Sequence, residues 1–346
     1  MPEIASQESG QQAFSVRQIP PFVRVGVVGV GSMGQNHARV YSEMADLVGV
    51  VDANPAVGKR VAARTETAYY PTVKDLVAAG VEAATVAVPT RLHHQVAKEL
   101  IDAGVHVLVE KPLAANIEDG RAIVRHAKEA GVVLAAGHIE RHNPVVAFAK
   151  QALAAGEFGD LVTASARRVS NFPDRVRDVG VIMDLGIHDV DVLRYVVGTE
   201  VESVYASGGR RVHATFEDHA TILLNFADGV NGFIEVSWLT PMKVRKFALT
   251  CLRNFVEVDY TDQSIRISSS TVEKYDPSDL YRVSFHYDTR QVSVQREEPL
   301  KRELLDFLAA IKGGRAPLVS GEDALETLRV CEAAVRSQQE RKLVWL

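Results

Sequence analysis

The chain contains little cysteine, no long apolar run and no strong excess of either charge. Its two cysteines, Cys251 and Cys331, lie far apart among 346 residues and lack the spacing of metal ligands. We therefore expect no disulfide, no metal site and a reducing, cytoplasmic compartment. Because no apolar run approaches the roughly 20 residues that span a bilayer, we expect no membrane partner. The formal net charge of −5 argues against a nucleic-acid partner.

What the chain does contain is the composition of a globular protein with two cores. Hydrophobic residues make up 47% and charged residues 24% of its length, which suits two domains better than one. The first twenty residues are polar and lack the apolar core of a signal peptide. We therefore predict a polar tail at residues 1–21, a first domain at 22–142 and a second at 143–346.

In the first domain, short β-branched runs alternate with helical stretches. Asn54, Thr72 and Asn116 are predicted helix N-caps, and Gly104 and Gly131 stand where helices should end. This alternation is typical of βαβ units and predicts a doubly wound parallel sheet. The predicted strands lie at residues 23–28, 47–51, 83–88, 105–109 and 132–136.

The second domain has a different pattern, in which two helices, at 145–155 and 181–197, are followed by runs with strand character. Turn signals such as Asp228-Gly229 separate some of these runs and indicate a largely antiparallel sheet. Two further helices are predicted at 300–311 and 321–338. The predicted strands lie at residues 201–207, 220–226, 231–238, 247–252, 255–260 and 264–268.

A glycine-rich turn, GVGSMG, follows the first predicted strand and opens a helix. Such glycines permit a tight turn and let a pyrophosphate approach the free N–H groups at the helix N-terminus. The next strand ends at Asp52, whose carboxylate suits both ribose hydroxyls and would repel a 2′-phosphate. The sequence therefore predicts NAD rather than NADP as cofactor. The predicted cofactor residues of this turn are Gly29, Gly31, Ser32, Met33 and Gly34.

Two further stretches carry a family resemblance. They are AVPTRLHHQVAKELIDAGVHVLVEKPLA at 87–114 and VIMDLGIHDVDVLRYVVG at 181–198. With the glycine turn, they resemble the glucose–fructose oxidoreductase/inositol dehydrogenase (Gfo/Idh/MocA) family over nearly the whole chain after the tail. The resemblance implies an NAD-dependent dehydrogenase that oxidises a secondary hydroxyl of a sugar. It also implies a Rossmann domain followed by a large, mostly antiparallel open sheet with helices on one face.

Lys111 lies just after a predicted strand, at the edge where ligands bind in doubly wound sheets. A lysine there can hydrogen-bond the reacting oxygen while hydride leaves the adjoining carbon. Glu110 and Pro112 on either side would fix its approach, and the resemblance implies a cis Lys111–Pro112 bond. The same resemblance implies a wider cofactor site, made of Pro89, Thr90, His93, Glu110 and Lys111.

Asp184 and His188 are four residues apart and would project from one face of a helix. His188 has a reference pKa of about 6.5, so it suits a general base near neutrality. Asp184 would bind substrate or support the protonated imidazole, and Asp191 is a second candidate orienter. The expected catalytic residues are Lys111, Asp184 and His188, with His188 as base and Lys111 polarising the oxygen. The reverse division between lysine and histidine remains open.

The sequence also departs from the family pattern before the Asp–His helix, because Asp178-Val179-Gly180 replaces the more usual three glycines. Together with the stretches 137–144 and 167–180, this resembles the branch that acts on nucleotide sugars. The expected reaction is oxidation of C3 of a UDP-N-acetylhexosamine or a related nucleotide sugar. Cations suited to a diphosphate or a uronate carboxylate are Arg141, Arg168, Arg175, Arg177 and Lys243. The expected substrate residues are Lys111, Arg141, Asn143, Arg168, Asp184, His188 and Lys243.

Two alternatives remain at this point. The substrate is a free polyol or hexose instead, or the chain is a non-catalytic NAD-binding regulator; the joint presence of Lys111, Asp184 and His188 argues against the second.

The alternation around 233–238 gives one predicted strand two apolar-bearing faces, of which one can meet another subunit. We expect a homodimer or homotetramer formed through the second sheet.

Overall fold

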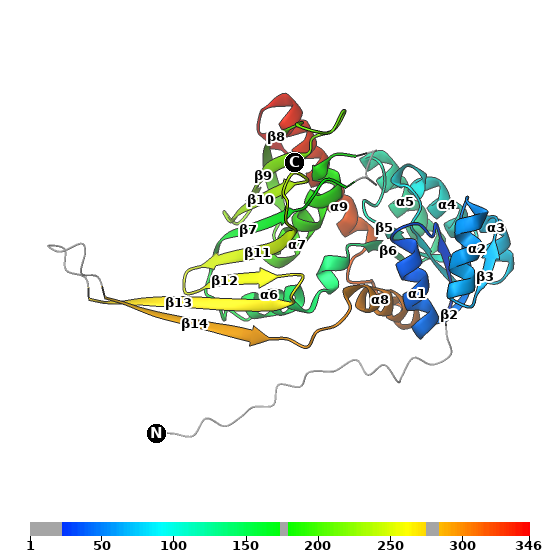
Figure 1. Ribbon diagram of the computed structural model, residues 1–346, viewed down its shortest axis with the longest axis horizontal. Helices are drawn as coiled ribbons and strands as arrows, with labels where there is room; N and C mark the ends of the chain where they lie inside the picture. Colours follow the sequence, from blue (N-terminus) through cyan, green and yellow to red (C-terminus); the bar gives the residue numbers. More distant parts are fainter. Residues whose placement is uncertain (1–22, 174–178, 275–283) are drawn as a thin grey trace, which may run out of the picture.

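The computed structural model describes residues 23–173, 179–274 and 284–346, which form two sheets lying side by side (Figure 1). The predicted polar tail, Arg175 and Arg177 lie outside the described residues. Within the described part, no helix combines the length and the apolar character that crossing a membrane requires.

The first sheet is parallel throughout, with strand order β3-β2-β1-β4-β5-β6. Its central strands are buried along their length, as expected when helices cover both faces. The doubly wound prediction is therefore confirmed. The strands are β1 (Arg24–Val28), β2 (Asp46–Val51), β3 (Ala68–Tyr70), β4 (Ala83–Val86), β5 (His106–Glu110) and β6 (Leu134–Gly137). The helices between them are α1 (Gly34–Met44), α2 (Pro55–Arg64), α3 (Val73–Ala78), α4 (His93–Asp102) and α5 (Ile117–Ala130).

The local signals that predicted these helices work as expected. The side chains of Asn54, Thr72 and Asn116 accept hydrogen bonds from backbone N–H groups in the first turns of α2, α3 and α5. Gly131 ends α5 in the left-handed conformation, and Gly104 follows α4 with a φ of +72°. Only β3 was not predicted, since three residues give too short a pattern.

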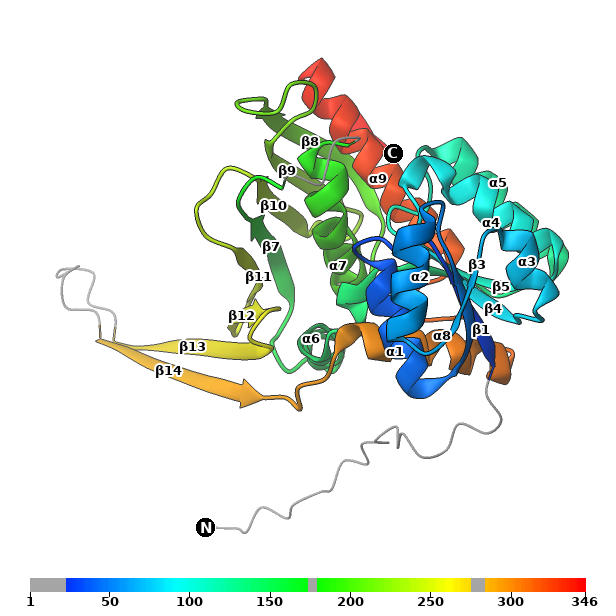
Figure 2. The ribbon, with the colours of Figure 1, turned by 45° about the vertical axis from the view of Figure 1, so that its right-hand side comes forward.

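The second sheet has nine strands in the order β14-β13-β12-β11-β7-β10-β9-β8-β15. Every pair is antiparallel except β7 with β10, which is parallel. β13 and β14 extend away from the rest of the molecule as a two-stranded ribbon (Figures 1 and 2). The strands are β7 (Leu161–Val169), β8 (Val201–Gly209), β9 (His219–Phe226), β10 (Asn231–Ser237), β11 (Val244–Cys251), β12 (Phe255–Asp259), β13 (Ser264–Lys274), β14 (Ser284–Ser293) and β15 (Val344–Trp345).

The central strand β7 was not predicted, and neither were β14 and β15. The inward positions of β7 are Ala164, Ala166 and Arg168, so alternation of burial is present without alternation of hydrophobicity. A charged residue at a buried position is the reason that the pattern was missed, and its partners are described below.

The helices of the second half join the two sheets. α8 (Pro299–Gly313) inserts Leu304 and Phe307 into the apolar core of β1 and α1. α9 (Gly321–Glu340) contacts α5, β6 and β8, so it packs on both sheets (Figure 2). The division at residues 142 and 143 stays a prediction, but the C-terminal helices contribute to both halves. The remaining helices are α6 (Pro144–Ala154) and α7 (Ile187–Val197).

Candidate active site

The glycine turn between β1 and α1 is shaped to receive a ligand. Gly29 has a φ of +86°, and a Cβ there would lie 2.7 Å from backbone atoms of the β4 edge. A Cβ on Gly34 would lie 1.8 Å from the Gly29 carbonyl oxygen, whereas one on Gly31 would meet no atom within 4 Å. α1 begins without a side-chain cap and without an acidic residue in its first turn. Free N–H groups and open space beside Gly31 fit a pyrophosphate.

Asp52 lies beside this turn at the carboxyl end of β2. Its carboxylate accepts hydrogen bonds from the backbone N–H of Val30 at 2.9 Å and of Asn54 at 2.8 Å. These bonds hold the carboxylate at the edge where the ribose of a dinucleotide lies in Rossmann folds. Ser32 is exposed and Met33 is partly exposed, both next to the same opening.

The segment after β4 places two predicted cofactor residues on the surface and turns a third inward. Pro89 is exposed and Thr90 partly exposed. His93 is 1% exposed, and its Nδ1 and Nε2 lie 2.9 Å from the carbonyl oxygens of Pro112 and Val88, respectively. Both ring nitrogens lie against backbone carbonyl oxygens, and the cofactor contact of His93 stays a prediction. The ring links the end of β4 to the loop that carries Lys111.

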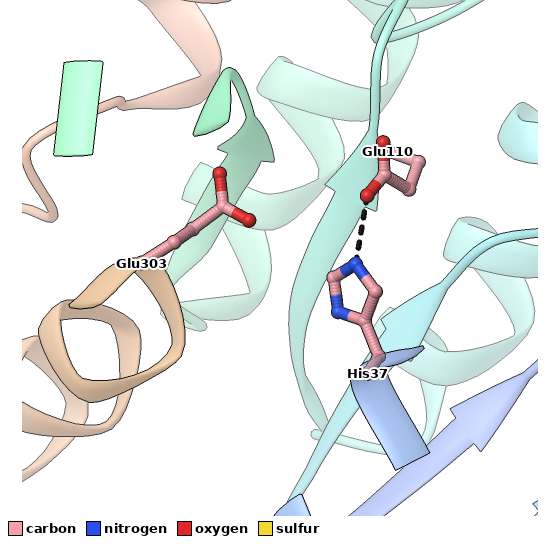
Figure 3. A group of neighbouring side chains, drawn as sticks. All are labelled: His37, Glu110 and Glu303. Carbon is pink, nitrogen blue, oxygen red and sulfur yellow. Dashed lines mark hydrogen bonds and ion pairs between the residues drawn. The ribbon is translucent and has the colours of Figure 1, made fainter. Parts of the chain in front are cut away.

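Glu110 is the last residue of β5 and faces two other buried titratable side chains, His37 of α1 and Glu303 of α8 (Figure 3). His37 Nε2 lies 2.7 Å from Glu110 Oε1, and Glu110 Oε2 accepts a hydrogen bond from the Lys111 N–H. Burial raises the pKa of Glu110, but the hydrogen bond from His37 outweighs it and leaves the pKa below its usual range. Glu110 therefore remains ionised and braces the Lys111 backbone.

Glu303 has a raised pKa in the same cluster. Burial and then the charge of Glu110 hold the pKa of Glu303 well above its usual range. One ligand atom from each of His37, Glu110 and Glu303 lies within 4.8 Å of the others, which is also a spacing that a metal ion would accept. The opposite pKa shifts of Glu110 and Glu303 already explain how two carboxyl groups share this buried cluster, and we assign the cluster no metal.

Lys111 and Asp184 meet between the two sheets. The Lys111–Pro112 bond is cis, as the resemblance implied. Lys111 Nζ donates to the Asp184 carbonyl oxygen at 2.8 Å and to its Oδ1 at 3.2 Å. Asp184 lies in a π-helical turn, Ile182–Gly186, which precedes α7. The predicted continuous α-helix is therefore wrong at this point, and Asp184 faces Lys111.

His188 lies in the first turn of α7, partly exposed. Its Nδ1 is buried without a hydrogen-bond partner among the described residues. Burial, and then the positive charges of Lys111 and Arg168, lower the pKa of His188 well below 6.5. The strongest charges that act on the ring are cations, and support of a protonated His188 by Asp184 stays a prediction. The imidazole is neutral at neutral pH and can accept a proton.

Arg141 and Asp191 form a buried ion pair with each other. Arg141, 3% exposed, donates from Nε and Nη2 to the two Asp191 carboxylate oxygens at 2.8 and 2.7 Å. A third bond goes from Arg141 to Asp323. The structure uses Arg141 and Asp191 for each other, and their roles toward substrate and His188 stay predictions. The pair joins the 3-10 turn Ile139–His142 to α7 and α9.

Arg168 and Asn143 are buried in a second polar network beneath the sheet. Arg168, 1% exposed, donates to both Asp189 oxygens and to Glu140, and its guanidinium lies 4.9 Å from the ring centroid of Tyr260. Asn143 caps α6 and donates to the Tyr260 carbonyl oxygen. Their polar groups are used within the protein, and their substrate contacts stay predictions.

Two cations remain near the site, one predicted and one missed. Lys243, as predicted, is exposed just before β11. Arg245 is partly exposed and lies directly across from Arg168 in the β7–β11 register. The sequence signal was the alternation of Arg245 with Phe247 and Leu249, which share its face of β11.

The parallel sheet, the glycine turn with Asp52 and the polar groups at the sheet's carboxyl edge define a dinucleotide-binding oxidoreductase. Three family models match the chain: an oxidoreductase family model with an NAD-binding Rossmann fold at 23–138, a GFO/IDH/MocA C-terminal domain at 146–266 and an oxidoreductase family C-terminal alpha/beta domain at 257–346. The chain belongs to the GFO/IDH/MocA oxidoreductase family, and its first domain binds NAD.

Several relatives resemble it over nearly their full length. UDP-N-acetylglucosamine 3-dehydrogenase of Acidithiobacillus ferrooxidans is 31% identical over 86% of this chain and 92% of its own. A solved structure of that enzyme aligns over 92% of this chain and 97% of its own with a TM-score of 0.82. Inositol 2-dehydrogenase 1 of Saccharopolyspora erythraea is 31% identical over 92% of this chain and 94% of its own. The structure of GenD2 from gentamicin A biosynthesis, in complex with NAD, is 26% identical with a TM-score of 0.79, over 94% and 97% of the chains.

Proposed function

We propose that this NAD-dependent dehydrogenase oxidises C3 of a UDP-N-acetylhexosamine or a related nucleotide sugar to a ketone. The observation that carries the proposal is the hydrogen bond from Lys111, just past the carboxyl end of β5, to Asp184, with His188 four residues further along the chain and within range of the Lys111 charge. The similarity to a UDP-N-acetylglucosamine 3-dehydrogenase supports the choice of substrate. Retention of all three polar groups favours an enzyme over a regulator.

The residues that would hold NAD are the glycine turn, Asp52 and the surface after β4, and the bound nicotinamide supplies the hydride acceptor. We infer that Lys111 Nζ hydrogen-bonds the reacting hydroxyl oxygen while the alcohol carbon loses hydride. The hydroxyl proton passes to His188, whose ring is neutral and whose Nδ1 is buried, leaving Nε2 to accept it. Asp184 holds the Lys111 ammonium in position through the 3.2 Å contact. A positioned general base of this kind contributes about 10²–10⁴ in rate.

The test is reduction of NAD, followed at the near-ultraviolet absorbance of NADH, with UDP-N-acetylglucosamine, its C6-uronate, myo-inositol and glucose. We expect turnover with a nucleotide sugar and little with the neutral compounds. Turnover with inositol alone would assign the chain to the inositol dehydrogenases, since one such relative is equally similar in sequence. If calorimetry shows that NAD binds but no compound reduces it, not even in a burst of one equivalent of NADH per enzyme, the result would favour a regulatory protein.

We further propose a homodimer or homotetramer formed through the outer face of the second sheet. Ile234, Val236 and Trp238 of the β10 region are buried, whereas Phe233 on the opposite face is 45% exposed. Phe233 lies directly opposite Leu223 on β9, which is itself 42% exposed. An exposed apolar row of this kind supports burial by a second subunit. Both cysteines are free and buried, which supports the proposed cytoplasmic location.

A further inference from the structure

Arg245 is an arginine whose charge has no partner inside the described part of the chain. It lies on the same face of β11 as Phe247 and Leu249, which are buried against the helices, so its side chain faces the layer that carries α7. Its guanidinium makes no hydrogen bond or ion pair with any described residue. Arginines that are withdrawn from water normally pair with a carboxylate, a phosphate or a carbonyl group.

The nearest cross-strand neighbour makes the position of Arg245 less favourable still. Arg168 stands directly opposite on β7, and like charges facing each other across a sheet are destabilising. The carboxylates of Asp189 and Glu140 are already bonded to Arg168. Burial and then the charge of Arg168 lower the pKa of Arg245, and the charges of Glu140, Asp189 and Asp184 offset them only in part.

Arg245 also lies close to the proposed reacting groups and to a second cation. Its positive charge contributes to the low pKa of His188, and the charge of Asp184 acts on Arg245 in turn. The exposed ammonium of Lys243 lies near enough for Arg245 to be the chief cause of its lowered pKa. The two cations therefore lie near each other, and Arg245 lies within electrostatic range of Asp184 and His188.

We propose that Arg245, with Lys243, binds an anionic group of the sugar substrate. The group is either the diphosphate of a nucleotide sugar or a carboxylate on the sugar ring, because both present paired oxygens that a guanidinium fork can bridge. An anion here would neutralise the Arg168–Arg245 repulsion and would fix the sugar relative to His188. The inference rests on the proposed function in taking a sugar derivative as substrate.

The test compares Arg245→Gln and Lys243→Gln with Lys246→Gln. Lys246 is the matched control, since it neighbours Arg245 on β11, lies on the outer face and forms an exposed ion pair with Asp259. Steady-state kinetics with saturating NAD would use UDP-N-acetylglucosamine, its C6-uronate and myo-inositol. We expect Arg245→Gln to raise KM for anionic substrates by about tenfold or more, with Lys243→Gln smaller and Lys246→Gln unchanged.

The pattern across substrates identifies the anion. A loss with both nucleotide sugars assigns Arg245 to the diphosphate, and a loss confined to the uronate assigns it to the carboxylate. An equal loss with myo-inositol, or a KM within twofold of wild type for both nucleotide sugars, overturns the proposal. If the wild type oxidises no nucleotide sugar, the proposed function fails. In that case, calorimetry measures the binding of UDP and of glucuronate to the NAD-loaded protein. We expect Arg245→Gln to weaken the binding of one of these two ligands. Unchanged binding of both ligands would overturn the proposed anion subsite.

Discussion

At the scale of single residues, His188 shows how strongly surroundings decide chemistry. Its reference pKa near neutrality suggested a base that titrates near pH 7. In the folded protein the partly exposed ring has a buried Nδ1 and lies within range of the charges of Lys111, Arg168 and Arg245. Each of these influences disfavours the imidazolium ion, so the neutral form persists into acidic solution.

This lowered pKa gives the first prediction, a rate that does not change through neutrality. The base acts in its neutral form, so kcat/KM should stay level near pH 7 and fall only as pH drops through a value well below 6.5. His188→Asn should lower kcat by about 10²–10⁴ and leave NAD affinity within twofold. The measurements are pH–rate profiles and NAD calorimetry. An acid limb at pH 6.5 or above in the wild type would contradict this account.

Glu303 carries the second prediction, because a buried acid with a raised pKa makes stability depend on pH. The native state keeps the proton that Glu303 releases above about pH 4.3 in the unfolded chain. The contribution of Glu303 to the free energy of unfolding therefore falls as pH rises. Glu303→Gln should remove that loss. Between pH 5 and pH 8, the variant should gain on the order of 1 kcal/mol relative to wild type in urea unfolding.

The control for this effect is Glu129→Gln, at an exposed position at the end of α5. Its stability relative to wild type should not vary with pH beyond a few tenths of a kcal/mol. If Glu303→Gln behaves like the control, Glu303 ionises in the native protein and the protonated assignment of the cluster in Figure 3 fails.

At the scale of elements, buried ion pairs attach α7 to the rest of the protein. Arg168 of β7 binds Asp189, and Arg141 of the turn before α6 binds Asp191, two residues further along the helix. Because β7 and the 3-10 turn hold alternate carboxylates of the same helix, the position of His188 between the sheets is fixed from two sides. These arginines therefore hold α7, and with it His188, in position.

The third prediction compares adjacent arginines on β7. Arg168→Met leaves buried carboxylates uncompensated and should cost about 3–5 kcal/mol of unfolding free energy. Arg167→Met breaks only an exposed pair with Glu235 and should cost about 1 kcal/mol or less. Urea unfolding followed by circular dichroism measures both. Equal costs, or a stable Arg168→Met protein whose only defect is a raised KM, would restore the substrate-binding interpretation.

At the scale of the whole molecule, the described helices cover one face of the second sheet and leave its other face open (Figure 2). The open face carries the apolar row of Tyr205, Leu223 and Phe233, whose members are directly opposed across β8, β9 and β10. Beyond Ser268, where pairing with β12 ends, β13 and β14 leave the body of the protein as a two-stranded ribbon, which is marginally stable alone in water (Figure 1). Both features favour association through this face.

The fourth prediction follows from that open face. Wild-type protein should sediment as a dimer or tetramer, and Leu223→Glu with Phe233→Glu should shift it toward monomer, because charges on facing strands oppose burial. Lys128→Glu on the exposed surface of α5 is the control and should leave the assembly unchanged. Analytical ultracentrifugation across micromolar concentrations measures the effect. A monomeric wild type, or an unchanged assembly in the double variant, would rule out this interface.

The sequence by itself determined what short-range chemistry controls. The glycine turn, Asp52, the helix caps and the position of Lys111 after a strand all depend on neighbours within a few residues, and the structure places them as predicted. The family resemblance then carried the two-sheet architecture, including the cis bond before Pro112. These features were readable because each has a local signature.

The tertiary structure alone decided how the charged residues are used. Arg141 and Arg168 looked like ligand-binding cations, yet carboxylates 50 and 21 residues away neutralise them, and no local pattern reports such distant pairing. Conversely, Arg245 was passed over although it lacks a carboxylate partner within the described chain. The pKa of His188 likewise depends on Lys111 and Arg245, brought together from separate sheets. Burial and long-range charge are properties of the folded arrangement, so they decided which polar groups remain available for chemistry.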